Sequence, residues 1–187
     1  MPAVVEAAVP SKIGLMGVQT LLTEEEFLAL PEFAGKQELL DGELIELPPA
    51  KLSHSSLAKL IAKLLEGAVG SERVFLELGY RLGPRRWLVP DVSVLWPEQR
   101  IEHDWPQGSP MIAIEIASRG NKAFELERKR LLYLEGGAAE VWFMYPETHT
   151  MLVSRSDGGV VAVSPAADYH SDAIGVVVTP EYRTPKR

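Results

Sequence analysis

The 187-residue chain is 46% hydrophobic and has no cysteine, so it can bury one sizeable core but cannot form disulfides, cysteine zinc sites or thiol nucleophiles. Its formal net charge of -7 argues against a protein that coats nucleic acid non-specifically, because such binding uses many lysine and arginine contacts to phosphate. Charges interrupt the apolar stretches before they reach membrane-spanning length, and the four scattered histidines argue against a histidine-built zinc site. We therefore expect a cytoplasmic protein without a membrane segment.

Hydrophobic periodicity and turn signals divide the chain into helices and strands. Thr23 and Glu26 have the spacing of a capping box, and Asp41-Gly42 is the strongest short-range hairpin signal. Ser53 is the expected N-cap of the second helix. The predicted elements are a helix over 24–30, a hairpin over 38–47, a helix over 53–69, strands over 74–82, 87–95 and 111–117, a helix over 122–135, a strand over 141–145, and a hairpin of 150–153 with 160–163.

This order of elements predicts an α/β fold with a mixed central β-sheet, helices on its faces and an N-terminal β-hairpin. Residues 112–116 are almost continuously apolar, so we expect their strand to be central and covered on both faces. We expect residues 1–19 to form a flexible arm, 20–178 a single domain and 179–187 a loose basic tail, with the chain already loose over 176–178.

Two acidic residues lie within apolar stretches that are predicted to be strands. Asp91 follows Val89-Pro90, and Glu115 interrupts the central strand. A buried carboxylate is costly unless it is paired, hydrogen-bonded or bound to metal. If the two strands are neighbours, both carboxylates can share Mg²⁺ or Mn²⁺, with water and substrate phosphate as the remaining ligands. The alternative is a solvent-exposed strand end or an ion pair with Arg86 or Arg119.

Several short motifs follow one another in an order that resembles a known family. They are Glu38–Leu44, Ser53-His54, Val89–Asp91, Ile114–Ser118 and Lys129–Leu134. Pro90-Asp91 and Glu115 resemble the acidic elements of the PD-(D/E)XK nuclease superfamily, which has the restriction-endonuclease-like fold. The full set resembles its Uma-type branch of restriction endonucleases over roughly Thr23 to Val153. The resemblance implies a metal-dependent endonuclease that hydrolyses phosphodiester bonds in DNA.

One position departs from the superfamily pattern. A lysine is expected two residues after the second acid, and this chain has Ala117 there. The resemblance to the Uma-type branch suggests that Lys129 reaches the site from the following helix and supplies positive charge near the attacking water or the phosphate. The alternative is an exposed lysine that pairs with Glu125 one helical turn away.

The resemblance also brings in two residues outside the acidic pair. Glu38 resembles the acidic residue that begins the family's first hairpin, and it is either a further ligand, directly or through water, or an ordinary strand-edge glutamate. His54, near the start of a helix, either contacts the substrate phosphate or is structural. Tyr133 is expected to pack against the core with its hydroxyl at the rim.

Two classes of function are consistent with these residues. The first is a Mg²⁺-dependent endodeoxyribonuclease in which Asp91 and Glu115 bind the metal and Lys129 and Glu38 assist, acting as a homodimer because a duplex has two strands to cut. The second is a catalytically silent nucleic-acid-binding or assembly module, which Ala117 and the acidic net charge favour. Cleavage of RNA would use the same residues as the first.

Overall fold

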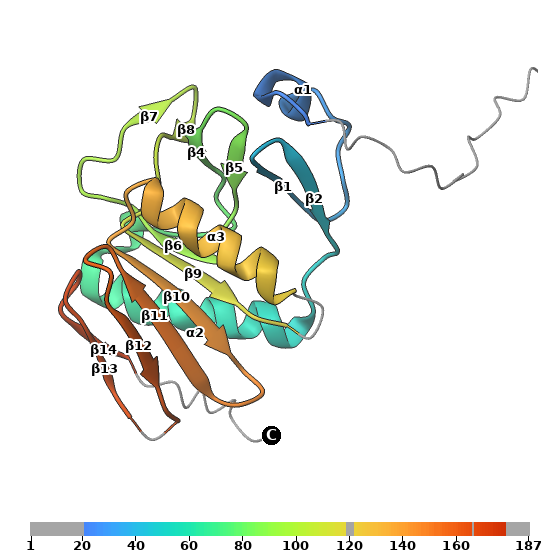
Figure 1. The fold of residues 1–187 in the computed structure, drawn as a ribbon. Helices are drawn as coiled ribbons and strands as arrows, with labels where there is room; N and C mark the ends of the chain where they lie inside the picture. The colour runs from blue at the N-terminus through green and yellow to red at the C-terminus, as the bar shows by residue number, and fades with distance from the viewer. Residues whose placement is uncertain (1–20, 119–121, 166, 179–187) are drawn as a thin grey trace, which may run out of the picture.

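The computed structural model describes residues 21–118, 122–165 and 167–178 (Figure 1). The arm expected over 1–19, the tail over 179–187 and Arg119 lie outside the described residues. The helices are α1 (Glu24–Leu28), α2 (Leu52–Val69) and α3 (Ala123–Glu135), with a 3-10 turn, η1, at Ser71–Arg73. The strands are β1 (Lys36–Leu40), β2 (Glu43–Leu47), β3 (Val74–Leu76), β4 (Tyr80–Gly83), β5 (Arg86–Leu88), β6 (Val92–Val94), β7 (Ile101–Glu102), β8 (Trp105–Pro106), β9 (Ile112–Ile116), β10 (Glu140–Tyr145), β11 (Thr150–Arg155), β12 (Val160–Val163), β13 (Tyr169–Ser171) and β14 (Val176–Val178).

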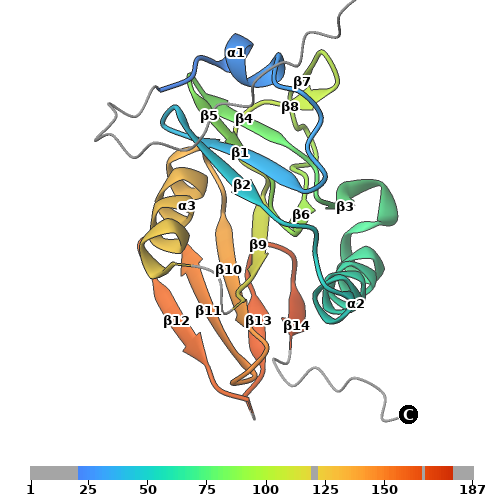
Figure 2. The ribbon, with the colours of Figure 1, turned by 90° about the vertical axis from the view of Figure 1, so that its right-hand side faces the viewer.

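The strands gather mainly into two sheets. The larger sheet has the order β12-β11-β10-β9-β6-β3, with β9 and β10 parallel and the other neighbours antiparallel. The smaller, antiparallel sheet has the order β2-β1-β5-β4 and contains the N-terminal hairpin. In Figure 2 the larger sheet lies between α3 and α2, and the smaller sheet lies above it. This mixed sheet with helices on its faces confirms the predicted fold class.

The central strand β9 divides the core into two halves. Its residues alternate, so that Ile112, Ile114 and Ile116 pack toward α2 while Ala113 belongs to the cluster under α3. Every residue of β9 is buried, as predicted for a strand covered on both faces. Glu115 shares the face of Ala113, and the alternation therefore directs its carboxylate toward α3.

Two of the predicted strands are each divided between the two sheets. The stretch 74–82 contains β3 and β4, separated by a turn in which Glu77 has a φ of +50°. The stretch 87–95 contains β5 and β6, separated by Val89-Pro90-Asp91. Pro90 cannot donate a ladder hydrogen bond, and the chain passes at this point from the smaller sheet to the larger one. Asp91 therefore lies in a bend before β6, and its predicted place in mid-strand is wrong.

Other local predictions are confirmed or corrected. The Asp41-Gly42 turn joins Leu40 to Glu43 with both turn residues at positive φ, as a two-residue hairpin requires. The N-cap of α2 is Lys51, not Ser53, because the Lys51 carbonyl already accepts the first helical hydrogen bond. Residues 176–178 are not loose, since they form β14 and pair with β13.

Within residues 21–118, 122–165 and 167–178, no helix combines the length and apolar character needed to cross a membrane.

Candidate active site

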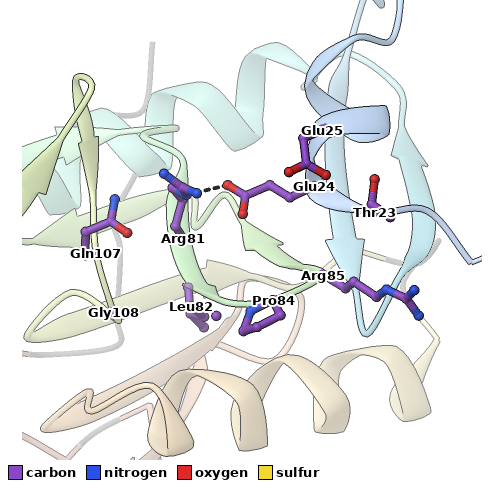
Figure 3. Close-up of a pocket in the computed structure, with 10 residues that line it drawn as sticks. Thr23, Glu24, Glu25, Arg81, Leu82, Pro84, Arg85, Gln107 and Gly108 are labelled. Carbon is purple, nitrogen blue, oxygen red and sulfur yellow. Dashed lines mark ion pairs between the residues drawn. The ribbon is translucent and has the colours of Figure 1, made fainter.

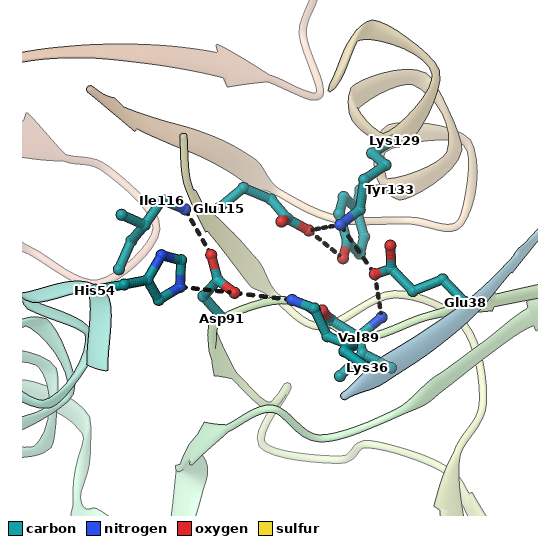
Figure 4. A network of polar contacts seen from close by, with 9 residues as sticks. All are labelled: Lys36, Glu38, His54, Val89, Asp91, Glu115, Ile116, Lys129 and Tyr133. Atoms are coloured by element: carbon teal, nitrogen blue, oxygen red, sulfur yellow. Dashed lines mark hydrogen bonds and ion pairs between the residues drawn. The ribbon is translucent and has the colours of Figure 1, made fainter. Parts of the chain in front are cut away.

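Charged side chains converge at the place where the two sheets meet α2 and α3 (Figure 4). They come from β1, α2, the bend before β6, β9 and α3. Figure 4 shows their polar ends directed toward one another. We call this group the charged cluster, and it consists of Lys36, Glu38, His54, Asp91, Glu115, Lys129 and Tyr133.

Asp91 is held by three donors. Its Oδ1 lies 2.8 Å from Nζ of Lys36 and 3.2 Å from Nε2 of His54, and its Oδ2 accepts a 2.7 Å hydrogen bond from the backbone N–H of Ile116. Burial alone would raise the pKa of this carboxyl, but the bond to His54 and the charge of Lys36 outweigh it and hold the pKa well below its usual range. Asp91 is therefore ionised although it is only 4% exposed.

Glu115 and Lys129 form a buried pair. The Lys129 ammonium lies 2.6 Å from Oε1 of Glu115 and 2.9 Å from Oε1 of Glu38, and the Tyr133 hydroxyl donates to Oε1 of Glu115 at 2.8 Å. Burial works to lower the pKa of Lys129, but the two carboxylates hold it above its usual value. Burial raises the pKa of Glu115, opposed by the ammonium groups of Lys129 and Lys36. The ammonium is consequently charged and tightly positioned.

Sheet register explains why the two acids meet. In the antiparallel pair of β6 and β9, Val92 lies opposite Ile114, so continuing the register by one residue places Asp91 opposite Glu115. Directly opposite residues of an antiparallel pair project from the same face with Cβ atoms about 5 Å apart. By this extension of the register, the two carboxylates project toward the same space, Glu115 from within β9 and Asp91 from the bend before β6.

The structure excludes several alternative roles for these residues. Glu38 is not on a strand edge, because β1 lies between β2 and β5, and the residue is 1% exposed with Oε1 bonded to the N–H of Val89 at 2.9 Å. Glu125 pairs with Lys122, not with Lys129. Arg86 pairs with Asp41 and Glu135 and so neutralises neither acid of the site.

His54 lies at the rim of the charged cluster, with a side chain 22% exposed. The hydrogen bond with Asp91 is the largest influence on its pKa and raises it, against the opposite effect of burial. Its ring joins α2 to the bend that carries Asp91. The position suits a group that contacts both the acid and something arriving from solvent.

Sequence reasoning missed Lys36 and misplaced Tyr133. Lys36 precedes Glu38 by two residues and so shares its face of β1, where its ammonium bridges Asp91 and the carbonyl of Val89 at 2.9 Å. Tyr133 is fully buried rather than at the rim, and its hydroxyl binds Glu115. The sequence does carry a signal for Tyr133: it follows Lys129 by four residues, so the two side chains lie on the same face of the helix.

The donor set fits a hard divalent cation that has few protein ligands. In the described ranges no group of three or more histidine and acidic side chains is arranged to hold a metal by itself. Mg²⁺ commonly uses one or two carboxylates and fills its other positions with water and substrate phosphate. The three carboxylates of the charged cluster exceed its two ammonium groups by one negative charge when His54 is neutral. Asp91 and Glu115 are thus suitable ligands.

A concave region lies elsewhere, on the smaller sheet (Figure 3). This pocket of about 560 Å³ is lined by the start of α1, the turn between β4 and β5, and residues 107–108. An ion pair of Arg81 with Glu24 spans it, and Figure 3 shows the Arg85 side chain extended away from that pair. None of the charged cluster lines it, so its role is separate from the carboxylate pair.

Comparisons with known proteins bear on the family and the fold of the chain. The model of the family Uma2, described as "Putative restriction endonuclease", matches residues 24–176. A solved structure described as "a putative nuclease belonging to DUF820", from Anabaena variabilis ATCC 29413, has a TM-score of 0.76 at 24% identity, covering 86% of this chain and 96% of that one. At that identity the likeness shows the fold.

One curated relative carries a different name. A 1-deoxy-D-xylulose 5-phosphate reductoisomerase of Mycobacterium avium (strain 104) is 30% identical over 131 residues, which is 65% of this chain. The match covers 31% of the relative, so the chain spans about a third of that protein's length.

Proposed function

The chain belongs to the Uma2 family, described as putative restriction endonucleases, and on that premise we propose that it is a metal-dependent endonuclease that hydrolyses phosphodiester bonds in DNA. Family membership and the fold of the solved nuclease-like relative support nuclease function in general. The observation that carries the finer proposal is the position of Asp91 in the bend just before β6, next in register to Glu115 of β9, with Glu115 bound to the buried ammonium of Lys129.

Asp91 and Glu115 would hold Mg²⁺, for which Mn²⁺ can substitute. When bound, such a cation polarises the scissile phosphate and lowers the pKa of an attacking water. Asp91 is ionised before any metal arrives, because Lys36, His54 and the N–H of Ile116 stabilise its charge. Its carboxylate therefore needs no proton loss to act as a ligand.

Lys129 would stabilise the negative charge that develops on the phosphate. Its ammonium is kept protonated by Glu115 and Glu38 and is fixed in place before the reaction, which is what electrostatic stabilisation requires. Glu38 acts as a positioning residue, because its bonds to Lys129 and to the N–H of Val89 leave it joined to protein rather than to substrate. His54, exposed at the rim, bonds Asp91 through Nε2, so its Nδ1 would donate a hydrogen bond to substrate phosphate only when the ring is protonated.

Ala117 is the chief argument for a catalytically silent module. Lys129 answers this objection, because α3 brings its ammonium within 2.6 Å of Glu115. The site therefore has a cation although the usual lysine position is occupied by alanine. DNA as the substrate and a homodimer as the assembly remain part of the proposal, since a symmetric pair presents one site to each strand of a duplex.

The test is cleavage of supercoiled plasmid DNA in Mg²⁺. We expect the wild type to nick or linearise the plasmid, and Asp91→Asn and Lys129→Met each to lower the rate about 100-fold or more. Lys122→Met is the matched control, because Lys122 is an exposed lysine of the same helix region that pairs only with Glu125 among the described residues. Cleavage at the wild-type rate by Asp91→Asn would contradict the proposed site. Salt-sensitive DNA retention without any product in the wild type would favour the silent module.

A further inference from the structure

A pocket of about 350 Å³ lies on the α3 face of the larger sheet, and its lining includes Phe143, the strand partner of Glu115. We call it the side pocket. Its described lining comes from the two residues that follow β9, the N-terminal part of α3, the strands β10 and β11, and the turn between them. The residues that matter for its chemistry are Ala117, Ala123, Leu126, Glu127, Phe143 and Tyr145.

Strand register connects the side pocket to Glu115. Phe143 is the partner of Glu115 in the parallel pair of β9 and β10, and Leu152 is the partner of Phe143 in the next pair. The three residues therefore form one row across neighbouring strands, on the face covered by α3. Adjacent strands lie about 4.8 Å apart, so the floor of the side pocket begins one strand away from the carboxylate.

The lining suits a flat, neutral aromatic group. Phe143 and Leu152 lie on the floor, Leu126 and Ala123 line the α3 side, and Tyr145 adds a second ring. The described lining residues include no lysine or arginine but include two acids, Glu147 and Glu127, and the Glu127 carboxylate is bound by Arg130. An aromatic ring would bury apolar surface and stack there, whereas a phosphate would meet no cation of the described lining. The volume falls within the range of small-molecule sites.

We propose that the side pocket receives one nucleobase of the nucleotide whose phosphate lies at Asp91 and Glu115, an assignment that rests on the proposed nuclease function. The base stacks against the apolar floor while its sugar-phosphate remains at the charged cluster. Glu127 keeps lone pairs beyond those that bind Arg130, and a carboxylate accepts from an exocyclic amino group. Bases with such an amino group, cytosine among them, are therefore preferred over thymine.

The experiment compares binding of dCMP, dTMP and 2-deoxyribose 5-phosphate, measured by isothermal titration in Mg²⁺. A mononucleotide has no phosphodiester bond, so binding is observed without turnover. We expect dCMP to bind about tenfold more tightly than the sugar phosphate, as base stacking of this kind supplies, with dTMP between them. Equal affinities for dCMP and the sugar phosphate would overturn the assignment.

Variants that fill the side pocket locate the binding. Ala123→Trp and Thr148→Trp place a large ring in the lining from exposed positions, so both are expected to fold. Each should reduce dCMP affinity to that of the sugar phosphate, whereas Leu131→Trp, on an exposed part of α3 outside the lining, should leave it unchanged. Undiminished dCMP binding in both filled variants would refute the site.

The nuclease reaction and the base-binding side pocket can be refuted independently of each other. A wild type that prefers dCMP over sugar phosphate but cleaves no plasmid would overturn the nuclease reaction and leave base binding standing. A wild type that cleaves plasmid in Mg²⁺ but binds dCMP and the sugar phosphate equally would overturn the side pocket alone.

Discussion

Replacing Lys129 by methionine tests whether the charged cluster depends on its buried ammonium. The ammonium contacts Glu38 at 2.9 Å and Glu115 at 2.6 Å, and the residue is 5% exposed. Methionine keeps most of the apolar stem, so the main change is two buried carboxylates left without their partner. Breaking a buried pair in this way costs about 3–5 kcal/mol of unfolding free energy, against a total of about 5–15 kcal/mol for an ordinary domain.

Urea denaturation at pH 7 measures this loss, first in EDTA and then in Mg²⁺. We expect added Mg²⁺ to restore more stability to Lys129→Met than to the wild type, because a divalent cation between Asp91 and Glu115 replaces the missing positive charge. Lys122→Met, which removes an exposed ammonium, should leave the midpoint unchanged. A wild-type midpoint for Lys129→Met in EDTA, or no extra gain in Mg²⁺, would refute the reasoning.

Further substitutions probe single contacts. Tyr80→Phe removes a buried 2.8 Å hydrogen bond to Ser93 and should cost about 1 kcal/mol at pH 7. Burial raises the pKa of Tyr80 above its value in the unfolded chain, which is about 10. The folded state is therefore destabilised relative to the unfolded state as the pH rises above about 10, because the unfolded chain loses this proton first. Urea titrations should show a steeper alkaline loss of unfolding free energy in the wild type than in Tyr80→Phe. Gly42→Ala places a side chain at a φ of +91° in the hairpin turn and should lower the unfolding free energy by about 1–2 kcal/mol. Urea denaturation measures this loss, and an unchanged midpoint would contradict the backbone strain. Lys36→Met removes the ammonium that competes with a cation for Asp91 and should raise Mn²⁺ affinity about tenfold by isothermal titration, whereas weaker binding would show that Lys36 instead supports the site.

Local signals predicted the elements but not how they are divided between sheets. The Asp41-Gly42 turn and the apolar spacing of α2 act over a few residues, and the structure confirms both predictions. The splitting of 74–82 and 87–95 depends on which partner strand each half meets, which is a long-range property. Pro90 was a visible sign of the second division, since proline interrupts a sheet ladder.

The sequence indicated which residues carry the candidate site but not how they are paired. A buried acid needs compensation, and this argument singled out Asp91 and Glu115 without naming their partners. Lys36 comes from β1 of the smaller sheet, 55 residues before Asp91, and no local pattern brings them together. Lys129 was reached through family resemblance, and its double contact to Glu38 and Glu115 emerges only once α3 is packed over β9.

The account depends most on Asp91 and Glu115 as ligands of one divalent cation. The direct measurement is isothermal titration of Mn²⁺ into the wild type and into an Asp91→Asn, Glu115→Gln double variant, each checked for folding by circular dichroism. We expect one binding site per chain in the wild type and none in the variant, with plasmid cleavage lost in parallel. A double variant that binds Mn²⁺ and cleaves DNA as the wild type does would contradict the account.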